Sequence, residues 1–221
     1  MKFAVAMLVF LAAAIPLNAY QLPATGSGAL ANEMQDFVDI LPVDDIVALS
    51  KAYATQDEQF RAVMAYLGNT ETKEWVQFFE AEPKFISLMN YVQNNGLDIY
   101  YLINKLNGAL RIPPLVQKLR ASLTISKVEI TGGLDGFLSD LGRIIPLEEI
   151  LNMFTKKLEH SKVVKDLTHE ITSNGFPEFY FSIFNNEHYK RLVDMVATVG
   201  VDREVFLAYT PLLLSTFVIV T

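Results

Sequence analysis

Residues 36–46 read DFVDILPVDDI, and residues 140–150 read DLGRIIPLEEI. The two stretches align without a gap at a spacing of 140 − 36 = 104 residues, and the identical residues include Pro42 with Pro146 and Ile46 with Ile150. The same spacing extends the match without a gap from Leu30–Leu110 to Leu134–Leu214. Similarity at one fixed period is the signature of a duplicated packing unit. We therefore expect two copies of one unit, with the function arising between them.

The matching positions are apolar residues and helix-ending signals. In each copy, apolar residues recur at helical spacing, and a proline followed closely by two acidic residues opens a helix (Pro42 and Pro146). Gly96-Leu97-Asp98 and Gly200-Val201-Asp202 each join a helix-ending glycine to a helix-capping aspartate. These patterns predict an all-α fold. It consists of two tandem copies of a multi-helix repeat of about 100 residues, packed together around a shared apolar core or cavity.

The domain organisation follows from these boundaries. Residues 1–19 are typical of a secretory signal peptide, with Lys2 before an apolar run that is too short to favour the alternative of a membrane anchor. Residues 20–29 are expected to be a linker and residues 30–110 the first repeat. Residues 111–133 form a connector, and residues 134–221 the second repeat, so that both repeats make one domain.

The last residues of the second repeat, Pro211–Thr221, are apolar. They lack the small residues and the polar spacer of a lipid-anchor signal, which is the alternative interpretation. We expect a closing helix or a strand-like tail that packs on the body of the protein.

Composition limits the partners. The formal net charge is −7 and cysteine is absent. Because basic residues are scattered, with no stripe to follow a phosphate backbone, nucleic acid is not an expected partner. A secreted chain without disulfides must be stabilised by packing, and a duplicated apolar core can provide this.

Familiar catalytic motifs are missing: there is no glycine-rich phosphate loop, no Gly-x-Ser-x-Gly elbow and no cysteine nucleophile. His160, His169 and His188 have no histidine counterparts in the first copy, and solvated surface positions are more consistent with them than a metal site. Two acidic pairs, Asp44-Asp45 and Glu148-Glu149, follow prolines. At these positions the positive end of a helix dipole stabilises their negative charges. We expect no enzymatic activity and no cofactor.

Large apolar side chains are abundant for such short helices. Phe78-Phe79 and Phe179–Phe181 place apolar groups around much of the helix circumference. A helix of this kind is buried on two sides. The residues alone leave two explanations open: an ordinary solid core, or an apolar cavity that an apolar ligand fills.

The stretch from Gly133 to Ile150 resembles the opening of the insect allergen-related repeat. Residues 41–46 are its equivalent in the first copy, and residues 96–98 and 200–202 resemble its closing turn. This family includes cockroach allergens, insect midgut microvillar proteins and nitrile-specifier proteins. The resemblance extends over nearly all of the chain from about Gly28 to Leu214.

The resemblance implies an all-helical capsule whose two repeats enclose one large apolar cavity holding fatty acids or phospholipids. It also implies secretion into the gut, a link to digestion or lipid handling, and association with the microvillar membrane or the peritrophic matrix. The apolar residues expected to line the cavity come in pairs from the two copies: Phe37, Ile46, Leu49, Phe60, Trp75, Phe79, Leu88 and Leu102, with Leu141, Ile150, Met153, Val164, Phe179, Ile183, Leu192 and Phe206.

Two other functions stay open. One is a nitrile-specifier-like role in detoxification, which resembles one branch of the family without a motif in this chain to mark it. The other is a structural coat protein of the gut surface with a solid core and no ligand.

Overall fold

The computed structural model describes residues 21–112, 128–172 and 175–220. Within these ranges the chain forms twelve α-helices and no strand, which confirms the all-α prediction. The predicted signal peptide and most of the connector lie outside the described residues. The first six helices are α2 (Ala29–Asp39), α3 (Val43–Gln56), α4 (Glu58–Leu67), α5 (Thr70–Glu80), α6 (Pro83–Asn94) and α7 (Ile99–Leu110). The second six are α8 (Gly133–Ile144), α9 (Leu147–His160), α10 (Lys162–Thr172), α11 (Phe176–Phe184), α12 (Glu187–Ala197) and α13 (Arg203–Val220).

Helix boundaries recur at the spacing of the sequence match. Helices α3 and α9 have 14 residues each and begin 147 − 43 = 104 residues apart. Each follows a proline and carries its acidic pair in the first turn, as expected. Asp57 caps α4 by accepting from the Phe60 N–H, and Asp98 caps α7 by accepting from the Tyr101 N–H. Asn69 caps α5 by accepting from the Thr72 N–H.

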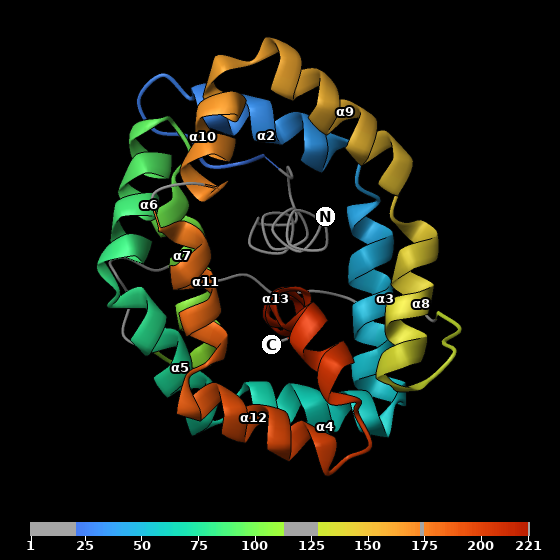
Figure 1. Cartoon of the computed structure of the whole chain (residues 1–221). Helices are drawn as coiled ribbons and strands as arrows, with labels where there is room; N and C mark the ends of the chain where they lie inside the picture. Colours follow the sequence, from blue (N-terminus) through green and yellow to red (C-terminus); the bar gives the residue numbers. More distant parts are fainter. Residues whose placement is uncertain (1–20, 113–127, 173–174, 221) are drawn as a thin grey trace.

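The helices form a closed ring in which the two repeats alternate (Figure 1). Helix α8 of the second repeat packs on α3 and α4, and α2 of the first repeat packs on α9 and α10. Helix α12 packs on α4 and α5. Each repeat therefore completes the apolar core of the other. None of the described helices is both long and apolar enough to cross a membrane.

Helix α13 lies inside the ring (Figure 1). It packs on α3, α4, α7 and α12, and so touches both repeats. Leu213 is fully buried, and the Thr210 hydroxyl lies 2.7 Å from the Tyr189 hydroxyl of α12. Of the two expected forms of the apolar tail, the structure shows the helix, which continues through Pro211 to Val220.

Aromatic rings fill the joint between α3, α4 and α8. The ring centroid of Phe137 lies 5.2 Å from that of Tyr53 and 4.7 Å from that of Phe60. The Tyr53 hydroxyl donates to Asp140 at 2.5 Å and accepts from the Gly132 N–H at 3.1 Å. One side chain of the first repeat therefore fixes the start of the second.

The segment before α2, expected to be a linker, is attached to the body. Leu22 is buried, and Ala24 forms an isolated bridge with Leu97. The Thr25 N–H donates to the Gly96 carbonyl at 3.1 Å, and the Asp98 N–H donates to the Pro23 carbonyl at 2.9 Å. These bonds hold the chain against the turn between α6 and α7.

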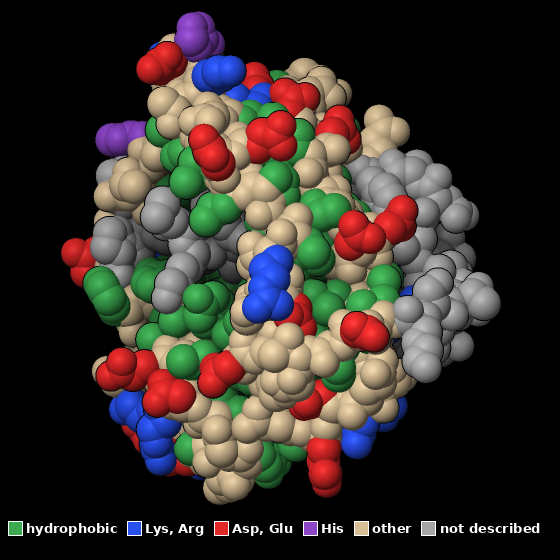
Figure 2. Space-filling view, turned by 90° about the vertical axis from the view of Figure 1, so that its right-hand side faces the viewer, with side chains coloured by type: hydrophobic (Ala, Val, Ile, Leu, Met, Phe, Trp, Pro, Cys, Tyr) green, Lys and Arg blue, Asp and Glu red, His purple; other side chains and the backbone are tan. Residues whose placement is uncertain are grey.

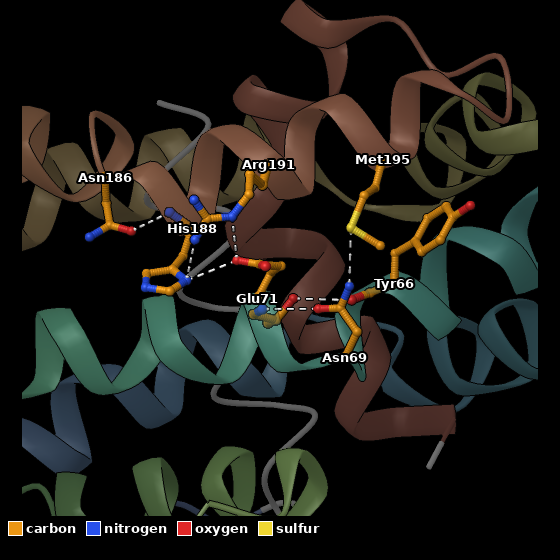
Figure 3. Close-up of polar contacts among 8 residues, drawn as sticks. Tyr66, Asn69, Glu71, Asn186, His188, Arg191 and Met195 are labelled. Atoms are coloured by element: carbon orange, nitrogen blue, oxygen red, sulfur yellow. Dashed lines mark hydrogen bonds and ion pairs between the residues drawn. The ribbon is translucent and has the colours of Figure 1, made fainter.

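Polar contacts join α5 to α12, as Figure 3 shows. Glu71 lies 2.8 Å from Nδ1 of His188 and 3.0 Å from Nε of Arg191, and these contacts lower the pKa of Glu71, His188 contributing most. The Asn69 amide, just before α5, donates to the sulfur of Met195 on α12. The His188 side chain is 35% exposed and takes part in this junction between the repeats.

Candidate functional site

The side chains expected to line a cavity all lie in or against the core. Twelve are buried: Phe37, Ile46, Leu49, Phe60, Trp75, Leu102, Leu141, Ile150, Val164, Phe179, Leu192 and Phe206. The other four are partly buried and pack against the core: Phe79, Leu88, Met153 and Ile183. All of them except Phe179 belong to one continuous apolar cluster of the described residues.

Trp75 shows what a fully buried position does. Its indole N–H donates to the Ile183 carbonyl of α11 at 2.8 Å, and its ring lies 4.7 Å from the ring of Tyr189 on α12. Because these neighbours come from the other repeat, Trp75 holds α5 against α11 and α12. Replacing Trp75 would disturb folding as well as any ligand site, so it is a poor residue for testing ligand binding.

The two repeats differ in how completely they cover their apolar residues. Helix α3 buries six residues, whereas its equivalent α9 buries only Ile150. Helix α13 packs on α3 and α4, but within the described residues neither α13 nor α7 packs extensively on α9 or α10. The ring is therefore filled by its own C-terminal helix on the side of α3, α4 and α12. Among the described residues, no helix fills the side of α9 and α10 in this way.

Side-chain size explains the difference. Ser50 and Ala54 of α3 correspond, at the spacing of 104 residues, to Phe154 and Leu158 of α9. Ser50 is fully buried and donates to the Ile46 carbonyl at 2.7 Å. Small side chains let a second helix approach closely, whereas Phe and Leu at these positions would collide with it. Phe154 and Leu158 remain only partly buried.

We name the incompletely covered surface the apolar wall. It consists of side chains on three consecutive helices, α9, α10 and α11, which pack in sequence on one another. Each member is partly buried and packs against the core: Met153, Phe154, Leu158, Val163, Ile171 and Ile183. Met153 and Ile183 were expected from the sequence. Phe154, Leu158, Val163 and Ile171 were not, although the Ser50–Phe154 and Ala54–Leu158 differences between the repeats could have indicated two of them.

A pocket of about 410 Å³ opens on the surface between α2 and α9. Met153 of the apolar wall lies in its lining. Lys157 bridges the two helices, 2.5 Å from Glu33 and 2.6 Å from Asp36, with its ammonium 5.7 Å from the centre of the Phe37 ring. Hydrogen bonding to Lys157 lowers the pKa of Glu33. The pocket is thus a polar junction between repeats whose charges neutralise one another.

One buried polar pair lies apart from these contacts. The Asn107 amide of α7 donates to Oε2 of Glu80 at the end of α5, over 3.1 Å. Asn107 is fully buried, and burial raises the pKa of Glu80 to about 7. Among the described residues, no group of three His, Cys, Asp or Glu side chains could hold a metal ion.

The outer surface is mixed. Seen from the side of α3 and α8, hydrophobic side chains reach the surface between scattered acidic ones (Figure 2). Leu147 at the start of α9 is 44% exposed, and Phe181 of α11 is 71% exposed.

The comparisons with known proteins identify the family of this chain. The family model described as insect allergen related repeat, nitrile-specifier detoxification matches residues 29–207, from the first residue of α2 into α13. The chain belongs to the insect allergen-related repeat family. Protein G12 of Anopheles gambiae is a relative of this repeat protein, 26% identical over 175 residues, which cover 79% of this chain and 82% of the relative.

Proposed function

We propose that this repeat protein binds fatty acids or phospholipids non-specifically in an apolar interior between its two repeats. The apolar wall is the observation that carries the proposal. It presents large apolar side chains on the core-facing side of α9, α10 and α11, where none of the described helices covers them as α13 covers α3.

Burial of acyl chain would supply the binding free energy. Each methylene removed from water contributes about 0.8 kcal/mol, so a long chain binds well without a specific polar contact. Water finds few hydrogen-bond partners in an apolar space of this kind, so an apolar ligand binds there in preference to water. This mechanism needs no catalytic group, so we propose a binding protein and not an enzyme.

The resemblance to midgut members of the family supports a location for this activity. We propose a protein secreted into the gut lumen or to the microvillar surface, where it handles lipid during digestion. Association with the microvillar membrane or the peritrophic matrix belongs to the same proposal.

A polar substitution in the apolar wall tests the site. Phe154→Gln is expected to weaken binding of the fluorescent fatty acid cis-parinaric acid about 10-fold, because an amide without a partner replaces an apolar contact. Fluorescence titration measures the affinity, and circular dichroism verifies that the variant is folded.

Phe181→Gln is the matched control, because Phe181 is 71% exposed on α11. We expect it to bind cis-parinaric acid like the unaltered protein. Equal affinities for the folded Phe154→Gln variant and the control would remove the apolar wall from the ligand site.

The family description also names nitrile-specifier detoxification. Glucosinolate breakdown by myrosinase in the presence of the protein separates this role from lipid binding. A lipid carrier leaves the ratio of nitrile to isothiocyanate unchanged, whereas a rise in nitrile would point to the detoxification branch.

A further inference from the structure

Two polar atoms are buried without a hydrogen-bond partner among the described residues: Oε1 of Glu80 and Oδ1 of Asn107. They belong to the two groups that are already joined by the 3.1 Å bond from the Asn107 amide to Oε2 of Glu80. A buried polar atom without a partner loses its hydration and gains nothing in return. Two such atoms on one bonded pair indicate a position where another polar group binds.

The pair is specific to one repeat. At the spacing of 104 residues, Glu80 corresponds to Phe184 and Asn107 to Pro211. The fold therefore accepts apolar residues at these positions, and the duplicated architecture does not require the polar pair. Large apolar residues lie beside the pair along the chain. Phe79 precedes Glu80, and its ring centroid lies 5.4 Å from that of Trp75, while Leu106 and Leu110 are buried on α7 together with Asn107.

The free atoms define the chemistry of the group that fits them. Oδ1 of Asn107 can only accept a hydrogen bond, so the ligand must donate. Burial raises the pKa of Glu80 to about 7, so its carboxyl holds a proton far more readily than an exposed one and can donate through Oε1. A hydroxyl or a carboxylic acid donates and accepts at once and satisfies both atoms. A phosphodiester or an ionised carboxylate offers no donor to Asn107.

We propose that Glu80 and Asn107 anchor the head of the bound lipid, and that they select an uncharged head carrying a hydroxyl or a protonated carboxyl group. This inference rests on the proposed lipid-binding function and adds a polar end to an otherwise apolar site. The ligands that the anchor favours are then fatty acids in their protonated form or acylglycerols with a free hydroxyl, which narrows the broad lipid class of the proposed function.

Displacement of the apolar dye Nile red from the full protein tests the anchor. Dodecan-1-ol is expected to displace the dye at about 10-fold lower concentration than its methyl ether, which cannot donate to Asn107. The double variant Glu80→Leu/Asn107→Leu is expected to bind both compounds equally while still binding Nile red. Glu74→Leu, which alters an exposed carboxylate on the same helix, keeps the 10-fold preference.

The outcomes separate the anchor from the proposed function. Equal displacement by alcohol and ether in the unaltered protein would overturn the anchor and leave lipid binding intact. The partner of Glu80 and Asn107 would then be water only. A preference that survives in the folded double variant would also overturn it. A protein that binds neither Nile red nor either compound would overturn the lipid-binding function itself. If the double variant does not fold, the test rests on the unaltered protein, in which dodecan-1-ol must displace the dye at a lower concentration than its methyl ether. A matching preference for dodecanoic acid over methyl dodecanoate would extend the ligand class to fatty acids.

Discussion

Replacing Gly96 by alanine is expected to lower the free energy of unfolding by at least about 3 kcal/mol. Gly96 has a φ of 103°, where an L side chain is strained. A Cβ atom there would lie 2.6 Å from the Ala29 nitrogen and 2.9 Å from the Gly28 carbonyl carbon. Because both are backbone atoms, the segment before α2 must move and release its bonds to the turn. Urea unfolding followed by circular dichroism measures the loss.

The duplicated chain provides the control at the same place in the other repeat. Gly200 also has a positive φ, of 81°, but the nearest atom to its added Cβ is the flexible amide of Gln59, at 3.3 Å. Gly200→Ala should therefore cost only about 1–2 kcal/mol, from the backbone strain. A loss at Gly96 no larger than the loss at Gly200 would contradict the described attachment of residues 22–29.

Glu80→Gln is expected to stabilise the protein at pH 8 by up to about 3 kcal/mol and to have little effect at pH 4.5. Burial, the largest cause, raises the pKa of Glu80 from 4.5 to about 7. The folded state therefore binds this proton more tightly than the unfolded state. The stabilising effect of the proton is fully present below pH 4.5 and is lost as the pH rises through 7. Glutamine stays neutral at every pH, so the variant does not lose stability in this way as the pH rises.

The measurement is the difference in free energy of unfolding between variant and unaltered protein at both pH values. Glu74→Gln controls for the loss of one negative charge, because Glu74 is exposed on the same helix. It should change stability by no more than about 0.5 kcal/mol at either pH. A Glu80→Gln difference that is the same at pH 4.5 and pH 8 would show that Glu80 is solvated.

Local signals in the sequence determine most of the fold. Pro42 and Pro146 mark the starts of α3 and α9, and Asp98 caps α7 as expected. These signals act through neighbouring backbone groups, so a single sequence reveals them.

The candidate site was predicted less well, because it depends on which helix covers which. The sequence suggested large apolar residues such as Phe60 and Trp75 as the lining of a cavity. In the structure these side chains are almost completely buried by other residues of the protein. Periodicity shows that a side chain faces inward, but it does not show whether another helix or a ligand meets it there. That distinction depends on the path of α13, which covers α3 and leaves Phe154 of α9 incompletely covered.

The most direct test of the lipid-binding proposal is to identify what the folded protein carries. The mature protein would be purified under native conditions from an insect expression host, extracted with organic solvent and analysed by mass spectrometry, with acyl chains quantified against protein. We expect stoichiometric lipid, rich in fatty acids and acylglycerols if Glu80 and Asn107 anchor the head. A folded, helical protein that carries no lipid and takes up none from vesicles would contradict the proposal and leave a solid-core coat protein.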